Sequence, residues 1–397
     1  MTNQGKHRYV ILGAGRQGTA AAYDLVMRGA AADVLMCDRD GQVAARSAGR
    51  VNELCGCEVA RHRSVDVTDA VEVTSALRDA TVGLSAVPYY HNLAISRIAI
   101  AAGTSLVDMG GHTETVRHQL DLHADAVEAG VVVLPDCGMG PGLVNVLAVR
   151  VMQILDETRE IRVCDAGLPQ HPEPPWRYLC AFNINGLTNE YDGTVPLLRD
   201  GKIVHVEALS ECEAFEIPPL GKLEGFIAAG GSTAPWTFEG RLATFETRIL
   251  RYPGHWQQFH AYKQLGLFSE EPLEVAGQRV VPRDVYHALL APHIMVERFE
   301  DICVMHCEGR GRLDGKAATA LIDVVDRFDP QTGFTGMERL TGWHCAMMMR
   351  FVADGRVPAG ARALEALLLE GTPSANEVLD EVVARGIEVR SQVRSAS

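Results

Sequence analysis

The stretch Tyr9-Val10-Ile11-Leu12-Gly13-Ala14-Gly15-Arg16-Gln17-Gly18 decides the fold of the first part of the chain. An apolar run leads directly into the pattern Gly-x-Gly-x-x-Gly, and a helical pattern follows over 19–26. In such a unit Gly13 permits the tight turn, Gly15 lets a pyrophosphate approach the backbone, and Gly18 lets the helix pack closely on the strand. The amides of the first helical turn then point at the phosphates. The stretch therefore predicts a dinucleotide site formed by Gly13, Gly15, Arg16, Gln17 and Gly18.

An acidic residue follows the second expected strand. The run 33–37 ends at Asp38, 20 residues after Gly18, where a carboxylate can accept hydrogen bonds from the adenosine ribose. The same carboxylate repels the 2′-phosphate of NADP, so NAD is the expected cofactor. NADP is the alternative cofactor because Arg39 comes next, and a guanidinium can stack on adenine or bind a phosphate. A Rossmann-like domain that binds another nucleotide, or none, is the alternative for the whole unit.

Strand and helix patterns alternate from Tyr9 to about residue 134 at the spacing of βαβ units, which predicts a parallel sheet. The expected strands are 8–12, 33–37, 58–60, 81–86, 105–108 and 131–134. Open parallel sheets bind ligands at the carboxyl ends of their strands. The residues that end or follow the third and fourth strands should therefore flank the cofactor: Asp66, Val67, Ala86, Val87 and Pro88.

The pattern changes after Gly142. Alternating segments at 160–164, 204–208, 243–250 and 301–308, with turn residues at 200–201 and 314–315, predict a mixed or antiparallel sheet. We therefore expect an α/β protein with a doubly wound Rossmann sheet in residues 1–125. Residues 126–339 should form an α+β domain for substrate binding and assembly into a homodimer or higher homo-oligomer. The tail over 375–389 reads as a helix and a strand that return to the first domain, so that 340–397 complete it.

Composition argues against several classes of partner. The net charge of −14 over 397 residues argues against nucleic acid and anionic membranes as partners. No segment approaches the roughly 20 apolar residues of a membrane span. The first eight residues lead straight into the first strand without a signal peptide, so we expect a cytoplasmic protein. Cys303 and Cys307 share one face of an expected strand while His306 points to the other, so we expect no metal site.

Further motifs follow the glycine fingerprint along the whole chain. They are Val-Asp-Met-Gly-Gly-His at 107–112, Leu-Pro-Asp-Cys-Gly-Met-Gly-Pro-Gly-Leu-Val-Asn at 134–145, Pro-Glu-Pro-Pro at 172–175, Gly-Gly-Ser-Thr at 230–233, Arg-Ile-Leu-Arg-Tyr-Pro-Gly-His at 248–255, Pro-Arg-Asp-Val at 282–285 and Thr-Gly-Trp at 341–343. In this order they resemble the saccharopine dehydrogenase superfamily, and within it the lysine 6-dehydrogenases. The first and fifth of these motifs carry the Gly-Gly-His and Tyr-Pro-Gly-His runs, which are more similar to the lysine-deaminating branch.

The resemblance implies an enzyme that oxidises the ε-amine of L-lysine with NAD, releases ammonia and yields a semialdehyde that cyclises to 1-piperideine-6-carboxylate. An NADP-linked saccharopine or carboxynorspermidine dehydrogenase is the alternative within enzymes. A nucleotide-sensing protein without turnover is the alternative of another class.

Such a reaction needs a neutral amine, although a lysine ε-ammonium has an ordinary pKa of about 10.4. A desolvated pocket with a neighbouring base favours the neutral form. The candidate bases lie at or after the carboxyl ends of expected strands: His112, Asp108, Asp136 and Tyr89. The alternatives are a structural histidine that closes a turn, and aspartates that cap the elements after them.

The α-carboxylate of such a substrate calls for a guanidinium, whose planar fork matches it. Arg248 and Arg251 are the expected donors, with His255 and Thr233 near them and Tyr178 against the aliphatic stem. The alternative is that both arginines form ion pairs with acids such as Glu246.

Overall fold

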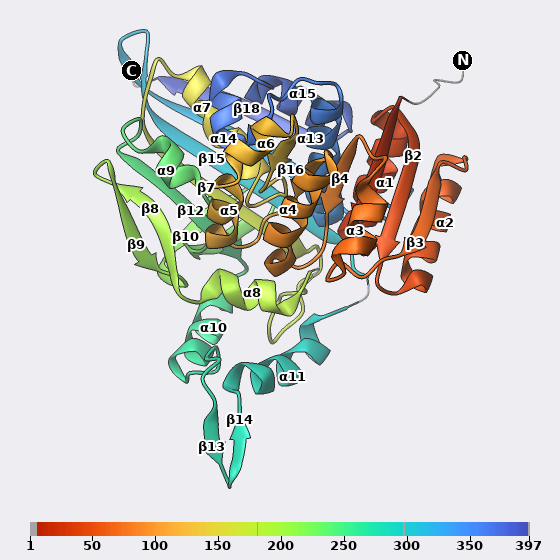
Figure 1. Cartoon of the computed structure of the whole chain (residues 1–397). Coiled ribbons are helices and arrows are strands. Elements are labelled where there is room, and N and C mark those ends of the chain that lie inside the picture. The colour runs from red at the N-terminus through yellow and green to blue at the C-terminus, as the bar shows by residue number, and fades with distance from the viewer. Residues whose placement is uncertain (1–5, 181, 297, 396–397) are drawn as a thin grey trace.

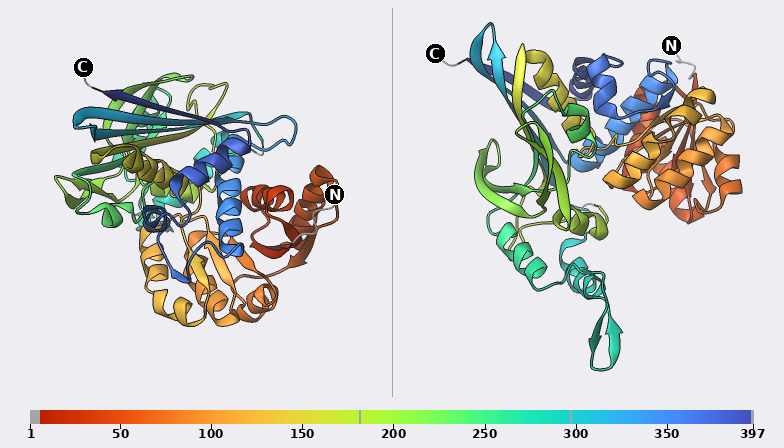
Figure 2. Two further views of the ribbon diagram at one scale, coloured as in Figure 1. Left: turned by 90° about the horizontal axis from the view of Figure 1, so that it is seen from above. Right: turned by 60° about the vertical axis from the view of Figure 1, so that its left-hand side comes forward.

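The computed structural model describes residues 6–180, 182–296 and 298–395, which form two lobes (Figures 1 and 2). The first lobe holds a sheet in the order β17-β6-β5-β4-β1-β2-β3, and every pair of neighbours is parallel. Its strands are β1 (His7–Leu12), β2 (Ala31–Asp38), β3 (Ala60–Ser64), β4 (Val82–Ser85), β5 (Ser105–Asp108), β6 (Val132–Leu134) and β17 (Gly360–Ala361). The predicted parallel Rossmann sheet is confirmed.

Helices cover both faces of this sheet because alternate residues of its strands are apolar on both sides. Tyr9 and Ile11 of β1 pack with the side that α1 and α2 cover, whereas Val10 and Leu12 pack with residues of α3 and α4. The helices of the lobe are α1 (Arg16–Arg28), α2 (Gly41–Cys55), α3 (Ala70–Leu77), α4 (Asn92–Ala102), α5 (Thr113–Leu120) and α6 (His123–Glu128), with a 3₁₀ turn at Tyr89–His91. The strand order reverses at β1, so a crevice opens between the ends of β1 and β4.

The second lobe is built on a nine-stranded mixed sheet, in which only β12 and β7 pair in parallel among the described strands. Its strands are β7 (Glu157–Pro169), β8 (Thr194–Arg199), β9 (Lys202–Glu207), β10 (Ser210–Ile217), β11 (Gly221–Ile227), β12 (Thr244–Arg251), β15 (Asp301–Leu313), β16 (Lys316–Arg327) and β18 (Glu388–Ser395). Helix α7 (Leu143–Ile154) covers one face of it. The predicted mixed sheet and both predicted turns are confirmed.

An arm extends from the second lobe at the bottom of Figure 1. It consists of α10 (His255–Gln264), the hairpin β13 (Leu273–Val275) and β14 (Gln278–Val280), and α11 (Pro282–Ile294). The remaining elements are α8 (Ile184–Tyr191), α9 (Ala234–Phe238), α12 (Gly336–Glu338), a π-helical turn at Arg339–Trp343, α13 (His344–Ala353), α14 (Leu364–Glu370) and α15 (Ala375–Ala384). No described helix is long and apolar enough to cross a membrane.

The tail differs from the prediction. Its strand β18 pairs with β16 at the edge of the second sheet and does not return to the first lobe. Other segments of 340–397 do return: the turn Arg339–Trp343 packs on α1, α13 packs on β4 and β5, and β17 joins the parallel sheet. Arg385, at the end of α15, also forms a buried ion pair with Asp24 of α1. The sequence pattern of β18 could not predict which sheet it joins, because a half-exposed strand fits the free edge of either sheet. In addition, β6 lies beyond the boundary predicted at residue 125, so the parallel sheet draws a strand from the segment assigned to the second domain.

Candidate active site

The turn between β1 and α1 leaves space for a pyrophosphate. A Cβ on Gly13 would lie 2.5 Å from the carbonyl oxygen of Ala86, and one on Gly18 would overlap the carbonyl oxygen of Gly13. By contrast, a Cβ on Gly15 would meet nothing within 4 Å. The tight positions hold strand, helix and the end of β4 together, and the open one lies where a phosphate would approach the amides of α1. The residues therefore fit a dinucleotide.

Asp38 lies at the end of β2, beside this turn. Its carboxylate accepts hydrogen bonds from the backbone N–H of Ala14 at 3.1 Å and of Asp40 at 3.0 Å. Each carboxylate oxygen can accept a further hydrogen bond, so the ribose hydroxyls of a nucleotide remain possible donors. Arg39 is exposed, and its carbonyl oxygen accepts a hydrogen bond from Ser64.

The other residues predicted to bind the cofactor also line this end of the sheet. Ala86 donates its N–H to Leu12, which fixes the end of β4 against β1. Val87 and Pro88 follow it, and Val67 lies in the loop after β3. Asp66, in the same loop, accepts hydrogen bonds from the N–H and hydroxyl groups of Thr68, and these bonds hold its pKa below the ordinary value.

Arg16 and Gln17 begin α1 and face the segment that returns from the second lobe. Arg16 forms an ion pair of 2.6 Å with Glu338 of α12. Gln17 has a buried side-chain oxygen that lacks a partner among the described residues. The carbonyl oxygen of Gln17 lies 2.6 Å from where a Cβ on Gly342 would sit. The π-helical turn therefore packs directly on the start of α1, which ties the two lobes together at the crevice.

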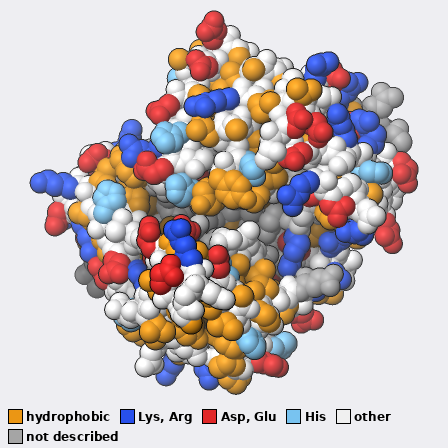
Figure 3. Space-filling model, turned by 60° about the horizontal axis from the view of Figure 1, so that its bottom comes forward, with side chains coloured by type: hydrophobic (Ala, Val, Ile, Leu, Met, Phe, Trp, Pro, Cys, Tyr) orange, Lys and Arg blue, Asp and Glu red, His pale blue; other side chains and the backbone are white. Residues whose placement is uncertain are grey.

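A chain of close contacts leads from the crevice to the second lobe. A Cβ on Gly111 would lie 3.6 Å from Cβ of Tyr89, and one on Gly110 would overlap a carboxylate oxygen of Asp136. The same position on Gly110 would lie 3.0 Å from Pro141, and a Cβ on Gly140 would lie 3.3 Å from Asp165 of β7. The loops after β5 and β6 therefore bridge the cofactor end of the first lobe and the nine-stranded sheet. Figure 3 shows the surface from the side of the arm, with a hollow across its middle.

Asp108, at the end of β5, has a buried carboxylate that is occupied by hydrogen bonds from three residues. It is 1% exposed and accepts hydrogen bonds from the N–H of Gly110 at 2.7 Å, the side chain of Gln119 at 2.6 Å and the N–H of Asp136 at 3.2 Å. Burial raises its pKa, although these hydrogen bonds oppose the shift. Its position joins the loops after β5 and β6, and little hydrogen-bonding capacity remains for a substrate.

Asp136 follows β6 and contrasts with Asp108. It is 2% exposed, and neither carboxylate oxygen makes a well-formed hydrogen bond with a described residue. The hydroxyl of Ser232 is near enough to oppose the rise in its pKa, but it too lacks a well-formed hydrogen bond. The backbone of Asp136 is left-handed, with φ of 61°. Burial, and then the neighbouring charge of Asp108, raise its pKa well above the ordinary value. A buried, unsatisfied carboxylate in a strained conformation is costly, and such groups concentrate at functional sites.

His112 and Tyr89 lie at the rim of the site and form a stacked pair, with ring centroids 4.8 Å apart. His112 is exposed and caps α5, because Nδ1 accepts a hydrogen bond from the N–H of Thr115 at 3.3 Å. This is the structural alternative for His112. Tyr89 is half-buried in the turn after β4, next to Gly111.

Three of the predicted substrate-binding residues come together on the second lobe. The guanidinium of Arg251 lies 4.8 Å from the centre of the Tyr178 ring, and the rings of Tyr178 and His255 are 5.1 Å apart. Arg251 donates a hydrogen bond of 2.8 Å to the hydroxyl of Tyr191, which lies 3.0 Å from Nε2 of His255. Burial lowers the pKa of His255 well below its ordinary value, which favours the neutral form of its ring.

Two carboxylates that sequence reasoning missed join this group. Glu190 of α8 lies 3.3 Å from Nη2 of Arg251. Burial raises the pKa of Asp165 to about 6 and that of Glu190 to about 8, although Arg251 opposes both shifts. Glu190 lies in a short helix without any motif, so nothing in the sequence marks it. Asp165 is a single acid in an otherwise apolar stretch of β7, and that is the signal that could have identified it.

The structure does not bring Arg248 and Thr233 to Arg251. Arg248 lies on the opposite face of β12, where ion pairs of 3.0 to 3.6 Å join it to Glu213, Glu246 and Glu211. Residues three apart on a strand point to opposite faces, so only one of the two arginines can line the site. Thr233 is 4% exposed, and its hydroxyl donates to the buried Glu365 at 2.8 Å.

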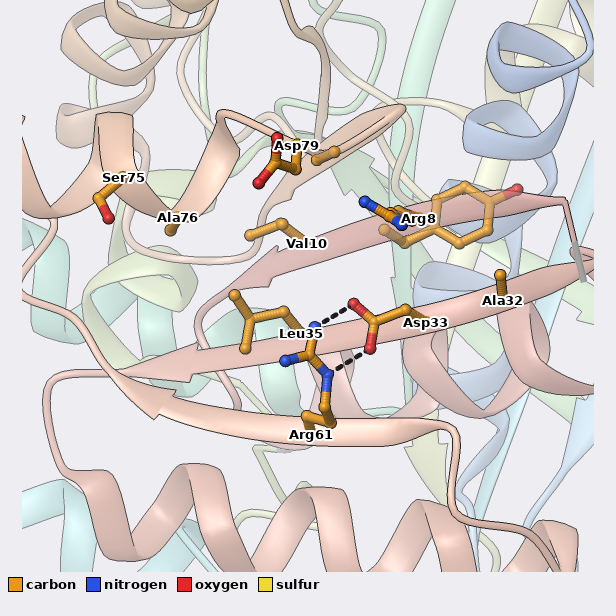
Figure 4. A pocket seen from close by; sticks show the side chains of 11 residues that line it. Arg8, Val10, Ala32, Asp33, Leu35, Arg61, Ser75, Ala76 and Asp79 are labelled. Atoms are coloured by element: carbon orange, nitrogen blue, oxygen red, sulfur yellow. Dashed lines mark hydrogen bonds and ion pairs between the residues drawn. The ribbon is translucent and has the colours of Figure 1, made fainter.

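A separate groove lies at the amino ends of β1 and β2 (Figure 4). Arg61 and Asp33 form a bidentate ion pair there, and Arg8 and Asp79 lie on the other side of the groove. Its place at the opposite end of the strands separates it from the cofactor crevice. Among the described residues, no group of three or more His, Cys, Asp or Glu is arranged to hold a metal ion.

Two family models match adjacent segments of the chain. Residues 9–134 match the saccharopine dehydrogenase NADP binding domain, and residues 138–387 match the saccharopine dehydrogenase C-terminal domain. The chain belongs to the saccharopine dehydrogenase family. The resemblance expected from the motifs is confirmed at this level, and the first lobe is the family's nucleotide-binding domain.

Individual members of the saccharopine dehydrogenase family are more distant. Saccharopine dehydrogenase [NADP(+), L-glutamate-forming] of Saccharomyces cerevisiae is 25% identical over 176 residues, which are 42% of this chain and 38% of that protein. The mitochondrial alpha-aminoadipic semialdehyde synthase of Rattus norvegicus is 23% identical over 203 residues, 47% of this chain and 21% of that protein. The chain thus spans well under half the length of these curated relatives.

The fold of a solved family member covers the whole chain. Apo saccharopine dehydrogenase (L-Glu forming) from Saccharomyces cerevisiae is similar with a TM-score of 0.78 and 18% identity, over 98% of this chain and 100% of that chain. This likeness shows that the two lobes follow the architecture of the family.

Proposed function

We propose that the protein is an NAD-dependent dehydrogenase that oxidises the ε-amine of L-lysine to the semialdehyde and releases ammonia. The observation that carries this proposal is that a candidate base and a candidate carboxylate-binding arginine lie one after the other, going from the cofactor crevice to the second lobe. Asp136, a buried carboxylate without a partner among the described residues, lies beside the cofactor crevice, and Arg251 lies beyond it on the second lobe. A long amino acid could reach both, with its amine at Asp136 and its carboxylate at Arg251.

Asp136 supports the proposal because its environment suits proton transfer from an amine. Burial raises the pKa of a carboxyl group and lowers that of an amine, so a dry contact between the two favours the neutral pair. A lysine ε-ammonium that reaches Asp136 would therefore transfer a proton to it and leave the neutral amine that hydride loss requires. The bound nicotinamide would supply the hydride acceptor. Water would then attack the substrate iminium, and the adduct would break its carbon–nitrogen bond to give the semialdehyde and ammonium, while Asp136 would release its proton to solvent.

Asp38 supports NAD as the cofactor. Its carboxylate is held at the end of β2 by two backbone N–H groups, at the place where the adenosine ribose would lie. A fixed negative charge there opposes a 2′-phosphate. Arg39 and the name of the matching family model favour the alternative, an NADP-linked enzyme.

The second candidate is an NADP-linked saccharopine dehydrogenase. The name of the yeast relative favours it, and so does the matching C-terminal domain. Saccharopine would present a secondary amine to Asp136 and the same α-carboxylate to Arg251. The two candidates therefore share a site and differ in what lies beyond the reacting nitrogen.

An assay of cofactor reduction separates the candidates. The purified protein is incubated with NAD or NADP and with L-lysine, L-ornithine, saccharopine or carboxynorspermidine, and absorbance at the wavelength of the reduced cofactor is followed. We expect the highest kcat/KM for L-lysine with NAD, and one equivalent of ammonia per reduced cofactor. Oxidation of saccharopine without oxidation of lysine would overturn the proposal. Cofactor binding without turnover on any of these amines would point to a nucleotide-sensing protein.

A further inference from the structure

Arg251 keeps hydrogen-bonding capacity although it is 3% exposed. Its Nε donates to Tyr191 at 2.8 Å, Nη1 donates to the carbonyl oxygen of Leu250 at 3.0 Å, and Nη2 donates to Glu190 at 3.3 Å. A guanidinium carries five N–H groups, so two of them have no acceptor in the described part of the chain. A buried cation with unused donors can bind an anionic acceptor, and a carboxylate matches its planar geometry.

Asp165 is the second incomplete group. It belongs to β7, which pairs with β12 in register so that Asp165 is opposite Ile249. Cβ atoms placed on Gly140 and Gly230 would lie 3.3 Å from its Oδ2 and 3.8 Å from its Oδ1, so small residues surround the carboxylate. No described residue donates a hydrogen bond to it, and it is not within ion-pair distance of Arg251. The carboxylate therefore lies next to two glycines and has no side-chain partner among the described residues.

Glu190 completes the group. Its carboxylate pairs with Arg251, and its side chain keeps 24% of its surface accessible. Glu190 is thus the acidic partner of Arg251, which leaves Asp165 as the acidic residue without a basic partner among the described residues. An occupant of this place should bring an acceptor for Arg251 and a positive donor for Asp165.

We infer that Arg251, Asp165 and Glu190 form a subsite for the α-carboxylate and the α-ammonium group of an L-amino acid, with Arg251 binding the carboxylate and Asp165 the ammonium. This subsite rests on the proposed function and deepens it, because it makes the α-amino group a requirement in addition to the carboxylate. A simple ω-amino acid or a diamine would leave one of the two charged groups unpaired, and an unpaired buried charge is costly.

The ion network around Arg248 shows what a structural arginine looks like on the same strand. Arg248 has three carboxylates within 3.6 Å, and they face one guanidinium on the opposite side of β12. That network includes Glu213, whose side chain is 43% exposed and lies outside the proposed site. Glu213→Gln is therefore a matched control for the removal of a carboxylate charge beside an arginine.

Binding of unreactive ligands tests the subsite independently of turnover. The protein saturated with reduced cofactor is titrated calorimetrically with L-norleucine, hexanoate and pentylamine. L-Norleucine has the α-amino and α-carboxylate groups of lysine but no ε-amine. We expect L-norleucine to bind at least tenfold more tightly than either of the other two. Asp165→Asn should weaken L-norleucine at least tenfold and leave hexanoate unchanged, Glu190→Gln should weaken it less, and Glu213→Gln should leave it as in the wild type.

The outcomes separate the subsite from the proposed reaction. Equal binding of hexanoate and L-norleucine, or equal losses for both in Asp165→Asn, would overturn the subsite even if lysine is oxidised. L-Norleucine binding that depends on Asp165, in a protein that oxidises saccharopine and not lysine, would support the subsite and overturn the proposed reaction. Thermal melting and binding of the reduced cofactor show whether each variant is folded.

Discussion

The loops after the neighbouring strands β5 and β6 each carry one buried aspartate, and the two are held in opposite ways. Asp108 accepts three hydrogen bonds that join the loops, whereas Asp136 accepts none from the described residues and has a left-handed backbone. Residue type, edge of the sheet and burial are the same. The difference lies in the unused hydrogen-bonding capacity, and only Asp136 has capacity left for a ligand.

The two faces of β12 repeat this difference with positive charges. On one face Arg248 is surrounded by three carboxylates. On the other face Arg251 has one carboxylate partner and unused N–H groups beside Asp165. In both pairs we therefore expect the saturated group to stabilise the fold and the incomplete group to bind the substrate.

The largest effect should follow from Asp136→Asn. The amide cannot take a proton from the substrate amine, so we expect kcat to fall about 10²- to 10⁴-fold, the usual contribution of a general base. Because burial raises the pKa of Asp136, ionisation of this group costs stability as pH rises above its ordinary value of 3.8. The variant should therefore be at least as stable as the wild type at neutral pH. Steady-state kinetics and urea unfolding measure the two quantities.

The dependence of turnover on pH, compared between the wild type and Asp136→Asn, is the control for this test. Wild-type turnover should rise with pH as the carboxylate of Asp136 forms, and Asp136→Asn should lose that rise. Retained turnover together with a lower unfolding free energy would mean that Asp136 belongs with Asp108 as a structural residue.

Asp108→Ala should have the opposite signature. Its removal leaves three buried donors without their acceptor, on Gly110, Gln119 and Asp136. Each unsatisfied donor costs about 1 kcal/mol or more, so we expect the unfolding free energy to fall by about 3 kcal/mol. Urea unfolding of this variant beside Asp136→Asn makes the comparison direct. Equal stability of the two variants would remove the distinction between the loops after β5 and β6.

The fold of the first lobe could be predicted from the sequence more accurately than the residues of the site. The glycine turn and the strands β1, β2, β4, β5 and β6 were predictable because apolar runs and turn residues repeat at βαβ spacing. The strand β3 was placed at 58–60 and lies at Ala60–Ser64, since its polar residues at the sheet edge give no apolar pattern. Local patterns describe buried strands well and edge strands poorly.

The site was harder because its chemistry depends on partners that are distant in the chain. Arg248 and Arg251 look equivalent in the sequence, and only the face of β12 separates them. His112 looks like a base and caps a helix, while Glu190 carries no motif and pairs with Arg251. Whether a polar group is satisfied is a property of tertiary contacts, so the sequence could name candidates but not rank them.

The smallest effect should come from substitution of Asp38. Its hydrogen-bonding capacity is partly used, whereas that of Asp108 is nearly all used and that of Asp136 is unused. The carboxylate of Asp38 accepts two backbone hydrogen bonds and can accept more, so part of its capacity stabilises the turn and part is left for the ribose. Loss of a hydrogen bond to a charged group costs about 1.5 kcal/mol or more. Asp38→Ser should therefore raise the KM for NAD about tenfold and raise the relative use of NADP, with the adjacent Arg39 as the expected partner of the 2′-phosphate.

Asp69→Ser is the matched control for this change, because Asp69 caps α3 through the N–H groups of Val71 and Glu72 and a serine can still cap. It should leave both cofactors unaffected. The ratio of kcat/KM for NAD to that for NADP, measured in the wild type and the two variants, decides the matter. A wild type that reduces NADP faster than NAD would show that the charge of Asp38 serves the turn alone and would place it with Asp108 among the structural carboxylates.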